Sequence, residues 1–453
     1  MQHPNGPITD KSPIRFSDPL PDACDVAIIG GGVIGVCAAI YMADLGLSVV
    51  IIEKGRIAGE QSSRNWGWIR QHGRDYAELP IMMEANRLWE ELDAQTGNNT
   101  GFKRGGVIYL ASTEAELAKR EQWLKTAREY QLDSRLIGRI ELANLIQQGD
   151  GAHQWVGATW TPSDARAEPW QAVAALAELA QSKGVAFREN CAARCLDFQN
   201  GKVTGVVTEY GIVRCEQVVL AAGAWSSLFL QNHDISIPQL SIHSKVCRTA
   251  PMAKVLDGEA KDETLAFRRR ADGGYTIVLS GGEQHFIGRD SFRHLGKWMP
   301  TAKQQIGSMK FGFAAPRGFP DAWSTARRWS GSDISPFEKV RVLSPAPEPA
   351  GRQSKMKRVF ASRFPQLGEP EITHAWAGMI DAMPDVVPIV DRVPEHPNLI
   401  VATGMSGHGF GIGPGFGKII ARMAAVREAG HDMRRFRFSR FTDGSKLEIG
   451  PGL

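Results

Sequence analysis

A glycine-rich turn between two apolar runs constrains this chain more than any other feature. Residues 25–35 read Asp-Val-Ala-Ile-Ile-Gly-Gly-Gly-Val-Ile-Gly, and residues 48–54 read Ser-Val-Val-Ile-Ile-Glu-Lys. The apolar residues before the glycines predict a buried parallel strand, and the second run predicts a neighbouring strand. A helix is expected between the two strands, and Val33 and Ile34, which lie within the glycine motif, are candidate binding residues.

The glycines Gly30, Gly32 and Gly35 have the spacing of a dinucleotide-binding turn. The first makes a tight turn, the second lets a pyrophosphate approach the backbone, and the third lets helix and strand pack closely. The start of the helix offers free N–H groups and a positive dipole end to phosphates. Glu53 lies 18 residues after Gly35, where an acid can accept ribose hydroxyls, and Lys54 follows it. The sequence predicts a dinucleotide site, and a purely structural glycine turn is the alternative.

The composition is that of a globular enzyme, with 43% hydrophobic and 23% charged residues in a chain of 453. A formal net charge of +4 is small for this length, so no nucleic-acid partner is expected. The six cysteines are scattered without the spacing of a zinc site, so we expect reduced core thiols and no metal.

Residues 1–22 are polar and are expected to form a flexible leader. They contain no apolar signal region, and no run in the chain approaches the roughly 18 apolar residues of a spanning helix. The expected location is the cytoplasm, with peripheral contact to the inner face of a membrane as an open alternative.

A segment rich in hydroxyls, glycine and tryptophan follows the second strand. Small residues here predict a loop or a helix start that lies against a flat, anionic ligand, and the alternative is an ordinary basic loop. The candidates in this segment are Ser62, Ser63, Arg64, Gly67, Trp68, Arg70, His72 and Arg74.

Glycine turns recur later in the chain, two of them at the ends of apolar strands. Residues 217–222 predict a buried strand that runs into Ala222, Gly223 and Trp225. Residues 399–402 predict another strand, and the cluster after it contains Gly404, Gly407, His408 and Gly409. Gly378 lies between these two regions. Repeated strand-to-glycine ends predict a sheet edge that faces one long ligand, and the last cluster predicts a second helix start aimed at an anion.

The remaining periodicity alternates helices and strands. Helices are expected at 79–93, 113–130, 139–147, 170–183 and 418–426. Strands are expected at 103–110, 186–188, 191–199, 202–208, 212–215 and 274–279, and Asn200-Gly201 predicts a hairpin turn.

Residues 292–330 form a basic and aromatic segment that interrupts the later strands. It carries seven Lys or Arg residues between Arg293 and Arg328 but only Asp321 as an acid. One interpretation is a module that lies on an anionic membrane surface. The other is a solvated basic face whose aromatic residues turn inward.

The order of these motifs resembles the FAD-dependent D-amino-acid oxidase superfamily, which includes sarcosine and glycine oxidases and D-amino-acid dehydrogenases. Within it the chain is most similar to the bacterial membrane-associated L-amino-acid deaminases, through residues 57–62, 122–127, 290–292 and 335–338. The N-terminal membrane helix of those deaminases is missing from this sequence.

The resemblance implies a fold and a domain arrangement. The expected fold is α/β (α+β overall), with a Rossmann-like FAD-binding domain and a discontinuous, antiparallel-sheet substrate domain. The expected FAD-binding parts are 23–100, 152–235 and 373–432, and the substrate parts are 101–151 and 236–372, with 292–330 inserted. Residues 433–453 are expected to be a C-terminal tail.

The resemblance also implies roles for single residues. Gly30, Gly32 and Gly35 would bind the FAD pyrophosphate, Glu53 the ribose, and Ala193 the adenine. Gly67, Trp68, Gly407, His408 and Gly409 would lie against the flavin ring, and a final helix entered near Gly415 would point at its pyrimidine end. Arg70 would hold the substrate carboxylate, and His408 would be a polar group at the flavin edge. His72, Arg74 and Arg248 are candidates for the rim of the substrate site.

Two positions depart from the sarcosine oxidases. Their second carboxylate-binding lysine falls on Gly411, and their oxygen-activating lysine falls on Thr276. No cysteine follows Cys247, and the 62–64 loop lacks a flavin-linking histidine, so the FAD is expected to be non-covalent. The electron acceptor stays open between oxygen and a membrane quinone.

The implied activity is hydride transfer from a carbon that bears an amine to flavin N5, after which the imine hydrolyses to a keto acid and ammonia. A secondary-amine oxidase of the sarcosine or opine type would yield an aldehyde and an amine. A 2-hydroxy-acid dehydrogenase of the same fold and a flavin-binding subunit without turnover are the remaining alternatives.

Overall fold

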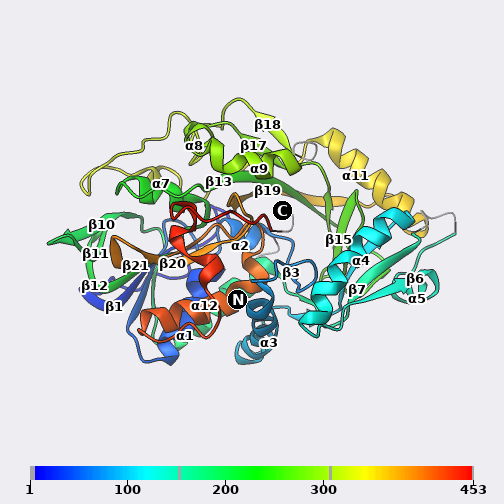
Figure 1. The fold of residues 1–453 in the computed structure, drawn as a ribbon, viewed down its shortest axis with the longest axis horizontal. Helices are drawn as coiled ribbons and strands as arrows, with labels where there is room; N and C mark the ends of the chain where they lie inside the picture. Colours follow the sequence, from blue (N-terminus) through cyan, green and yellow to red (C-terminus); the bar gives the residue numbers. More distant parts are fainter. Residues whose placement is uncertain (1–5, 151–154, 306–308, 451–453) are drawn as a thin grey trace.

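The computed structural model describes residues 6–150, 155–305 and 309–450. It has the α/β architecture of a Rossmann-like domain joined to a second, sheet-based domain, as expected. Figure 1 shows the sheet that contains β1 and β12 on the left, and the part with β7, β15 and α4 on the right.

The first sheet is built around the glycine turn. Its central strands β1 (Ala23–Ile29), β2 (Val49–Ile52) and β12 (Gly211–Leu220) are parallel, and Ile29 lies opposite both Ile52 and Leu220. Parallel pairing adds β9 (Ala186–Arg188) to β2 and β21 (His396–Thr403) to β12. The other strands are antiparallel: β10 (Ala193–Gln199), β11 (Lys202–Thr208) and β20 (Ile389–Val393). The carboxyl ends of β1, β2, β12 and β21 therefore share one edge.

Two helices pack against this sheet and against each other. α1 (Val33–Asp44) follows the glycine turn, and α12 (Gly409–Ala424) follows β21. A Cβ atom on Gly417 would lie 2.6 Å from the Cβ of Cys37, and one on Gly413 would lie 2.8 Å from a methyl carbon of Val33. Glycine at these positions permits the close approach of the helices, which lie below the sheet in Figure 1.

The second sheet has ten strands within the described residues and is mainly antiparallel. Its longest pairing joins β13 (Leu240–Thr249) to β19 (Ile372–Ala382). Two pairings are parallel, β5 with β14 and β17 with β18. The remaining strands are β5 (Val107–Ala111), β6 (Arg135–Gly138), β7 (Gly157–Thr161), β14 (Glu259–Lys261), β15 (Leu265–Arg269), β16 (Tyr275–Leu279), β17 (Gln284–Phe286) and β18 (Lys310–Gly312).

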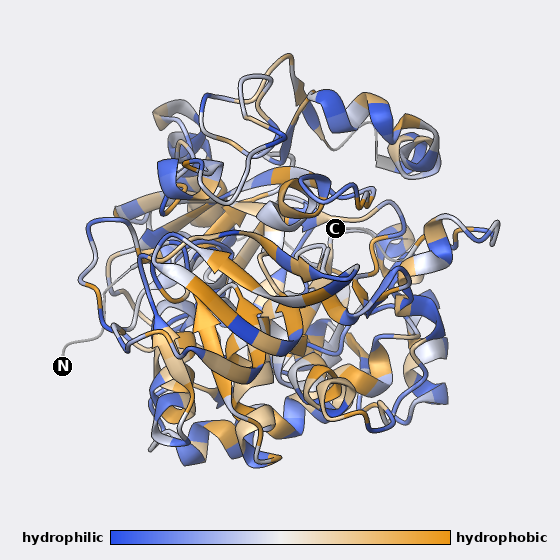
Figure 2. Cartoon of the chain, turned by 90° about the vertical axis from the view of Figure 1, so that its left-hand side faces the viewer, coloured by the Kyte–Doolittle hydropathy of each residue, from blue (hydrophilic) through white to orange (hydrophobic). Residues whose placement is uncertain are grey.

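A three-stranded sheet connects the two parts. It consists of β3 (Trp68–Ile69), β8 (Ala165–Arg166) and β4 (Lys103–Arg104). The other helices are α2 (Gln61–Arg64), α3 (Leu79–Gln95), α4 (Glu114–Glu129), α5 (Arg139–Leu145), α6 (Pro169–Ser182), α7 (Ser226–Gln231), α8 (Arg289–Arg293), α9 (Leu295–Gln305), α10 (Pro336–Lys339) and α11 (Ala350–Arg363). Figure 2 shows hydrophobic strands in the interior and mixed hydropathy on the outer helices.

Most expected elements are present, but three differ. The run expected as one strand over 103–110 is split at Gly105 and Gly106, and the two runs expected at 212–215 and 217–222 form the single strand β12. The last helix begins at Gly409 rather than near 415–418, because its glycines are needed for packing and do not end the helix. β7 and β19 lie almost entirely within the ranges expected for the FAD-binding domain, but both pair with strands of the second sheet.

The ends of the chain are packed rather than loose where the structure describes them. Ile8 and Phe16 are buried, and the backbone N–H of Ile8 donates to Ser63 at 3.2 Å. Near the other end, the Arg440 side chain is buried and pairs with Asp385 at 2.8 Å. The segment expected to be a flexible leader therefore contacts the domain at Ile8 and Phe16, and its first five residues lie outside the described part.

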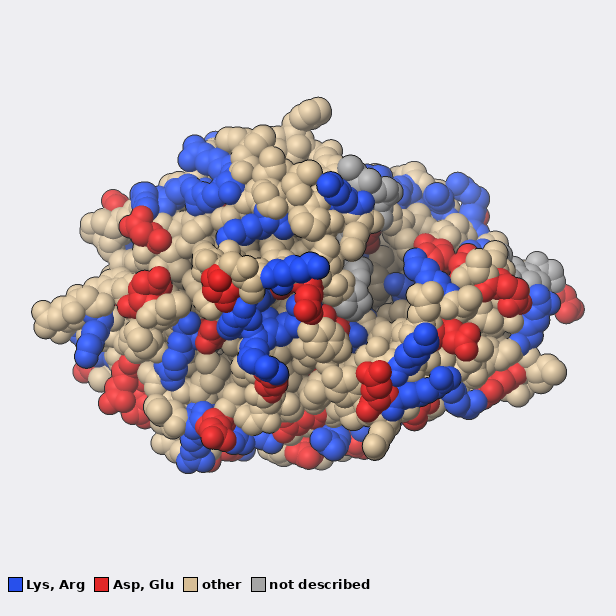
Figure 3. Space-filling model, in the orientation of Figure 1, with Lys and Arg blue, Asp and Glu red and all other residues tan. Residues whose placement is uncertain are grey.

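The inserted segment contains α8, α9, β18 and a long loop. Several large apolar side chains here are exposed: Phe292, Leu295, Met299, Phe311, Phe313 and Trp323. In Figure 3 the crest of the view, above α8 and α9, shows uncharged residues flanked by Lys and Arg. No helix within the described residues is both long enough and apolar enough to cross a membrane.

Candidate cofactor and substrate site

A cavity runs along the shared strand edge of the first sheet and is closed by β13 and β19 of the second. It brings together residues that are far apart in the sequence. Of the candidates from sequence, the following line it: Gly30, Gly32, Val33, Ile34, Glu53, Lys54, Ser62, Arg64, Trp68, Arg70, Arg74, Ala193, Ala222, Gly223, Trp225, Gly378, Gly407, His408 and Gly409.

The glycine turn has the geometry that a pyrophosphate requires. Gly30 has φ of +111°, and a Cβ atom there would lie 2.4 Å from the carbonyl oxygen of Ala221, so only glycine fits. Gly32 is the N-cap of α1, which has no side-chain cap and no acid in its first turn. The start of α1 thus presents backbone N–H groups to the cavity, and one of them, on Val33, donates to the Ser62 hydroxyl at 2.9 Å.

The side chain of Glu53 stabilises the glycine turn by hydrogen bonds. Its carboxylate accepts the backbone N–H of Gly31 at 2.8 Å and that of Gly55 at 2.7 Å. Burial raises the pKa of Glu53 to about 7, against the lowering effect of Lys54 and the two N–H donors. Lys54 itself lies 4.4 Å from the centroid of the Trp225 ring.

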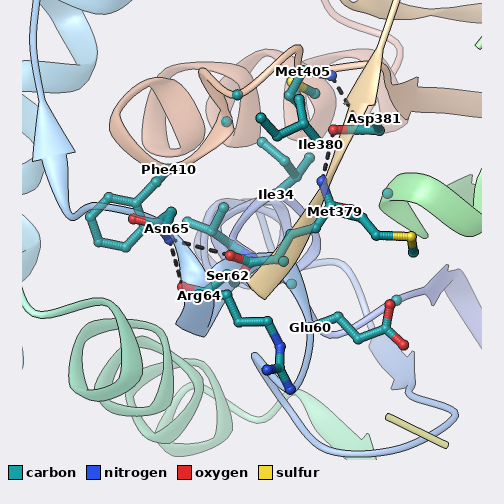
Figure 4. Close-up of a pocket in the computed structure, with 18 of the residues that line it drawn as sticks. Ile34, Glu60, Ser62, Arg64, Asn65, Met379, Ile380, Asp381, Met405 and Phe410 are labelled. Atoms are coloured by element: carbon teal, nitrogen blue, oxygen red, sulfur yellow. Dashed lines mark hydrogen bonds between the residues drawn. The ribbon is translucent and has the colours of Figure 1, made fainter. Parts of the chain in front are cut away.

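Three side chains join the segments that line the cavity, and none of them was predicted from the sequence. Glu60 accepts the indole N–H of Trp225 at 2.7 Å. Gln61 accepts the N–H of Ala224 at 2.9 Å and donates to Asp381 at 2.8 Å. Asp381 in turn accepts the N–H of Gly404 at 2.8 Å. It also accepts the N–H of Met405 at 3.2 Å (Figure 4). The only indication of them in the sequence was the acid Glu60, which lies two residues before Ser62.

The start of α12 also opens into the cavity. Its N-cap is His408, without a side-chain cap bond or an acidic first turn. Both α1 and α12 therefore direct positive dipole ends at one cavity, which suits a ligand with negative charge at two places.

Arg70 and Arg74 line the other end of the cavity, on a segment fixed by Asp164. The carboxylate of Asp164 accepts the N–H groups of Gln71 at 2.7 Å and His72 at 3.2 Å. Burial raises the pKa of Asp164 to about 7. Arg74 Nε donates to the carbonyl oxygen of Arg70 at 3.0 Å, so one arginine orients the backbone of the other.

His408 forms a buried pair with Glu78, which sequence reasoning also missed. The Nδ1 atom lies 3.1 Å from the Glu78 carboxylate. Burial and Arg74 lower the pKa of His408 to about 4 despite the neighbouring carboxylate. Burial acts to raise the pKa of Glu78, but His408, Arg74 and Arg70 outweigh it and the pKa lies below its usual value. The pair is thus a carboxylate and a neutral imidazole that donates Nδ1–H, which leaves Nε2 as an acceptor.

Several candidates lie outside the cavity lining. Gly35, Gly67 and Gly404 are close-packed positions where a Cβ atom would lie within 2.5 Å of a neighbouring atom, and Ser63 is buried. His72 is buried between Tyr109 and Trp123, and both of its ring nitrogens bond to threonine hydroxyls, so it packs rather than faces the rim. Arg248 bonds to Thr373, Thr276 is buried on β16, and Gly411 lies inside α12.

The residues present fit an FAD molecule. An extended cavity contains two helix starts and a glycine cradle. Within the described part of the chain, three buried side-chain nitrogens of its lining residues have no partner: Arg64 Nε, Arg74 Nη1 and His408 Nε2. Buried donors and acceptors of this kind are normally satisfied by a bound group. No group of His, Cys, Asp and Glu that could hold a metal is found among the described residues.

Fold and cavity together define a dinucleotide-binding protein. The family model for FAD dependent oxidoreductases (DAO) matches residues 25–423, so this chain belongs to that family. Its cofactor is FAD.

Solved structures of the family superpose closely on this chain. The structure of L-amino acid deaminase from Proteus myxofaciens in complex with anthranilate is 28% identical, with a TM-score of 0.89 over 95% of this chain and 97% of that one. The L-amino acid deaminase from Proteus vulgaris is 26% identical, with a TM-score of 0.88 over 94% of this chain and 100% of that one.

The first curated relatives are longer proteins. The mitochondrial pyruvate dehydrogenase phosphatase regulatory subunit of Mus musculus is 30% identical over 58% of this chain and 30% of its own length. The chain spans less than half the length of the first four such relatives.

Proposed function

We propose that this protein oxidises the C–N bond of an amino acid or a related carboxylated amine. The observation that carries the proposal is the placement of Arg70 and His408 in the same cavity as the glycine turn of α1. The likeness to the two deaminases, at 28% and 26% identity, supports a primary amine as substrate.

Each residue has a separate task in the proposed reaction. The guanidinium of Arg70, with the unpartnered Nη1 of Arg74 beside it, binds the substrate carboxylate. Nε2 of His408 accepts an N–H of the substrate amine, because Nδ1–H is donated to Glu78. Two anchors on opposite groups of one substrate carbon fix its orientation, which is the main requirement for hydride transfer.

Bound FAD supplies the acceptor for the hydride, which carries two electrons from the substrate carbon. Loss of an amine proton completes the imine, and addition of water gives the keto acid and ammonia. None of the cysteines lines the cavity within the described residues, which supports non-covalent FAD.

Anaerobic mixing of the purified holoenzyme with amino acids, secondary amines and 2-hydroxy acids tests the proposal. Bleaching of the visible flavin band by primary amino acids, with one keto acid and one ammonia formed per flavin reduced, is expected. Bleaching by hydroxy acids alone, or by no carboxylated amine, would overturn it.

We further propose that the inserted segment makes a peripheral membrane contact and that the electrons pass to oxygen or a membrane quinone. Phe292 and Phe313 are 62% and 95% exposed beside the basic residues of the segment. Co-sedimentation with anionic lipid vesicles should fall in the double variant Phe292→Ser/Phe313→Ser. It should be unchanged in Tyr210→Ser, which replaces an exposed aromatic residue in the turn between β11 and β12. Equal sedimentation of all three proteins contradicts the contact, and oxygen uptake during turnover distinguishes the two acceptors.

A further inference from the structure

The substrate end of the cavity holds more positive charge than one carboxylate can neutralise. Arg70, Arg74 and Lys261 all line it, and they come from two walls. The two arginines lie on the segment after β3, whereas Lys261 ends β14 of the second sheet. The aromatic ring of Tyr109 lies between the walls, with Arg70 Cζ 6.0 Å and Lys261 Nζ 5.0 Å from its centroid.

Within the described part of the chain, none of the three cations forms a salt bridge. Arg70 Nη1 donates to the backbone oxygen of His72, and Arg74 Nε donates to the backbone oxygen of Arg70. Nη1 of Arg74 has no hydrogen-bond partner, and the residue is buried, with only 4% of its surface exposed. A nearby cation behaves differently: Arg120, 5.7 Å from the same ring, is paired with Glu263 at 2.9 Å.

The acids near this end do not cancel the excess. Glu78 is committed to His408 and lies behind the cavity wall. Among the described residues the second sheet adds two carboxylates to the lining. Asp381 on β19 accepts the N–H groups of Gly404 and Met405, which leaves Glu283, next to β17, against three cations. A buried cation without a counter-ion is costly, so a lining of this kind is expected to gain its missing negative charges from the ligand.

We propose that the substrate carries a second carboxylate, which makes it an acidic amino acid. This inference rests on the proposed function and adds a substrate class to it. Arg70 and Arg74 bind the α-carboxylate, and Lys261, on the opposite wall, binds the side-chain carboxylate. Lys261 is then the residue that determines specificity, and it makes no contact with the reacting carbon.

Glutamate and glutamine provide the sharpest test, because they have the same shape and differ in charge. With the holoenzyme and both enantiomers, kcat/KM is expected to be about 10- to 100-fold higher for glutamate, the range of one charge-assisted bond. The ratio is expected to fall towards one in Lys261→Gln. It is expected to persist in Lys254→Gln, a surface lysine paired with Asp257 at 3.2 Å.

A binding measurement separates recognition from turnover. Glutarate and butyrate have no amine, so they cannot be oxidised. Glutarate is expected to perturb the flavin spectrum of the holoenzyme at concentrations about 10-fold or more below those of butyrate, and Lys261→Gln is expected to remove this difference.

The outcomes distinguish this inference from the proposed function. If glutamine or leucine bleaches the flavin as well as glutamate does, the inference is wrong and the deaminase proposal stands. If free lysine is the preferred substrate, Glu283 rather than Lys261 determines the specificity, and the inference is again wrong. If no carboxylated amine bleaches the flavin, the proposed function itself fails.

Discussion

Asp164 and Glu78 set the orientation of Arg70 and His408, although neither carboxylate lines the cavity. Asp164 accepts the N–H groups of Gln71 and His72 and so sets the backbone that presents Arg70. Glu78 accepts Nδ1–H of His408 and so leaves the opposite ring nitrogen as an acceptor. In both cases a buried carboxylate orients a group that faces the ligand, which is a common arrangement in enzyme sites.

Replacement of Arg70 tests the carboxylate anchor. Arg70→Leu should raise the Michaelis constant for carboxylate substrates by on the order of 10²-fold, because a charge-assisted bond of about 1.5–3 kcal/mol is lost. Steady-state kinetics with the best substrate measures the change. Arg120→Leu is the matched control, since Arg120 lies near the same Tyr109 ring but outside the lining. Equal Michaelis constants in Arg70→Leu and the parent enzyme would remove Arg70 from the site.

The His408–Glu78 pair predicts a pH dependence of stability. The pKa of His408 is about 4 in the folded protein against 6.5 for an ordinary histidine. Between those values only the unfolded chain binds the proton, so the stability contributed above pH 6.5 is lost as the pH falls to about 4. The lowered pKa of Glu78 acts in the same direction.

His408→Asn should therefore lose less stability than the parent protein when the pH falls from 7 to 5, by roughly 2 kcal/mol. Urea unfolding at both pH values measures the difference. The raised pKa values of Asp164 and Glu53 affect both proteins alike and cancel in the comparison. His431→Asn, which removes a histidine–carboxylate contact that is partly exposed, serves as the control. Parallel stability curves for His408→Asn and the parent protein would contradict the assignment.

Among the structural elements, α1 and α12 carry the site. Both begin at the cavity, and the glycines of α12 let them approach. The strand–turn–helix unit around Gly30 could be predicted because its signal is local. The start of α12 at Gly409 could not be predicted in the same way, because Gly411, Gly413 and Gly415 have a low helix propensity. The reason for glycine at these positions is the close packing of residues that are distant in the sequence.

The close approach of the two helices can be measured. In Gly417→Ala the added methyl group would lie 2.6 Å from the Cβ of Cys37 and 2.7 Å from its carbonyl carbon, so backbone must move. A loss of about 1–3 kcal/mol in the free energy of unfolding is expected. Gly296→Ala in α9, where a Cβ atom meets nothing within 4 Å, should be neutral or stabilising. Equal losses in the two variants would show that packing is not the cause.

The start of α1 gives a prediction about the cofactor. Gly32→Val places a branched side chain at the N-cap, where a Cβ atom already lies 3.1 Å from the Ser62 hydroxyl. The purified variant should be colourless, because the side chain occupies the path of the pyrophosphate. The visible absorbance of the purified protein measures this, and Gly138→Val, at an exposed N-cap with free space around it, should remain yellow.

At the scale of the whole molecule, the cofactor end of the cavity brings together three distant parts of the chain. They contribute Gly32 and Ser62, then Gly223, and finally Asp381 and His408. The sequence motifs predicted which segments would meet. They could not predict Glu60, Gln61 and Asp381, which join the segments, because hydrogen bonds between residues as many as 320 positions apart leave no local pattern.

This assembly predicts that FAD and the three segments are stabilised together. Linkage gives about 2.7 kcal/mol when free FAD is 100 times its dissociation constant, so removal of FAD should lower the melting temperature by several degrees. Hydrogen exchange should then accelerate in residues 57–68, 222–226 and 404–412 together, while β15 and β16, which lie away from the cavity, keep their protection. Added FAD should restore all three segments in parallel. Loosening of one segment alone would mean that Gln61 and Asp381 do not couple the others, and that the ligand binds a site already complete without it.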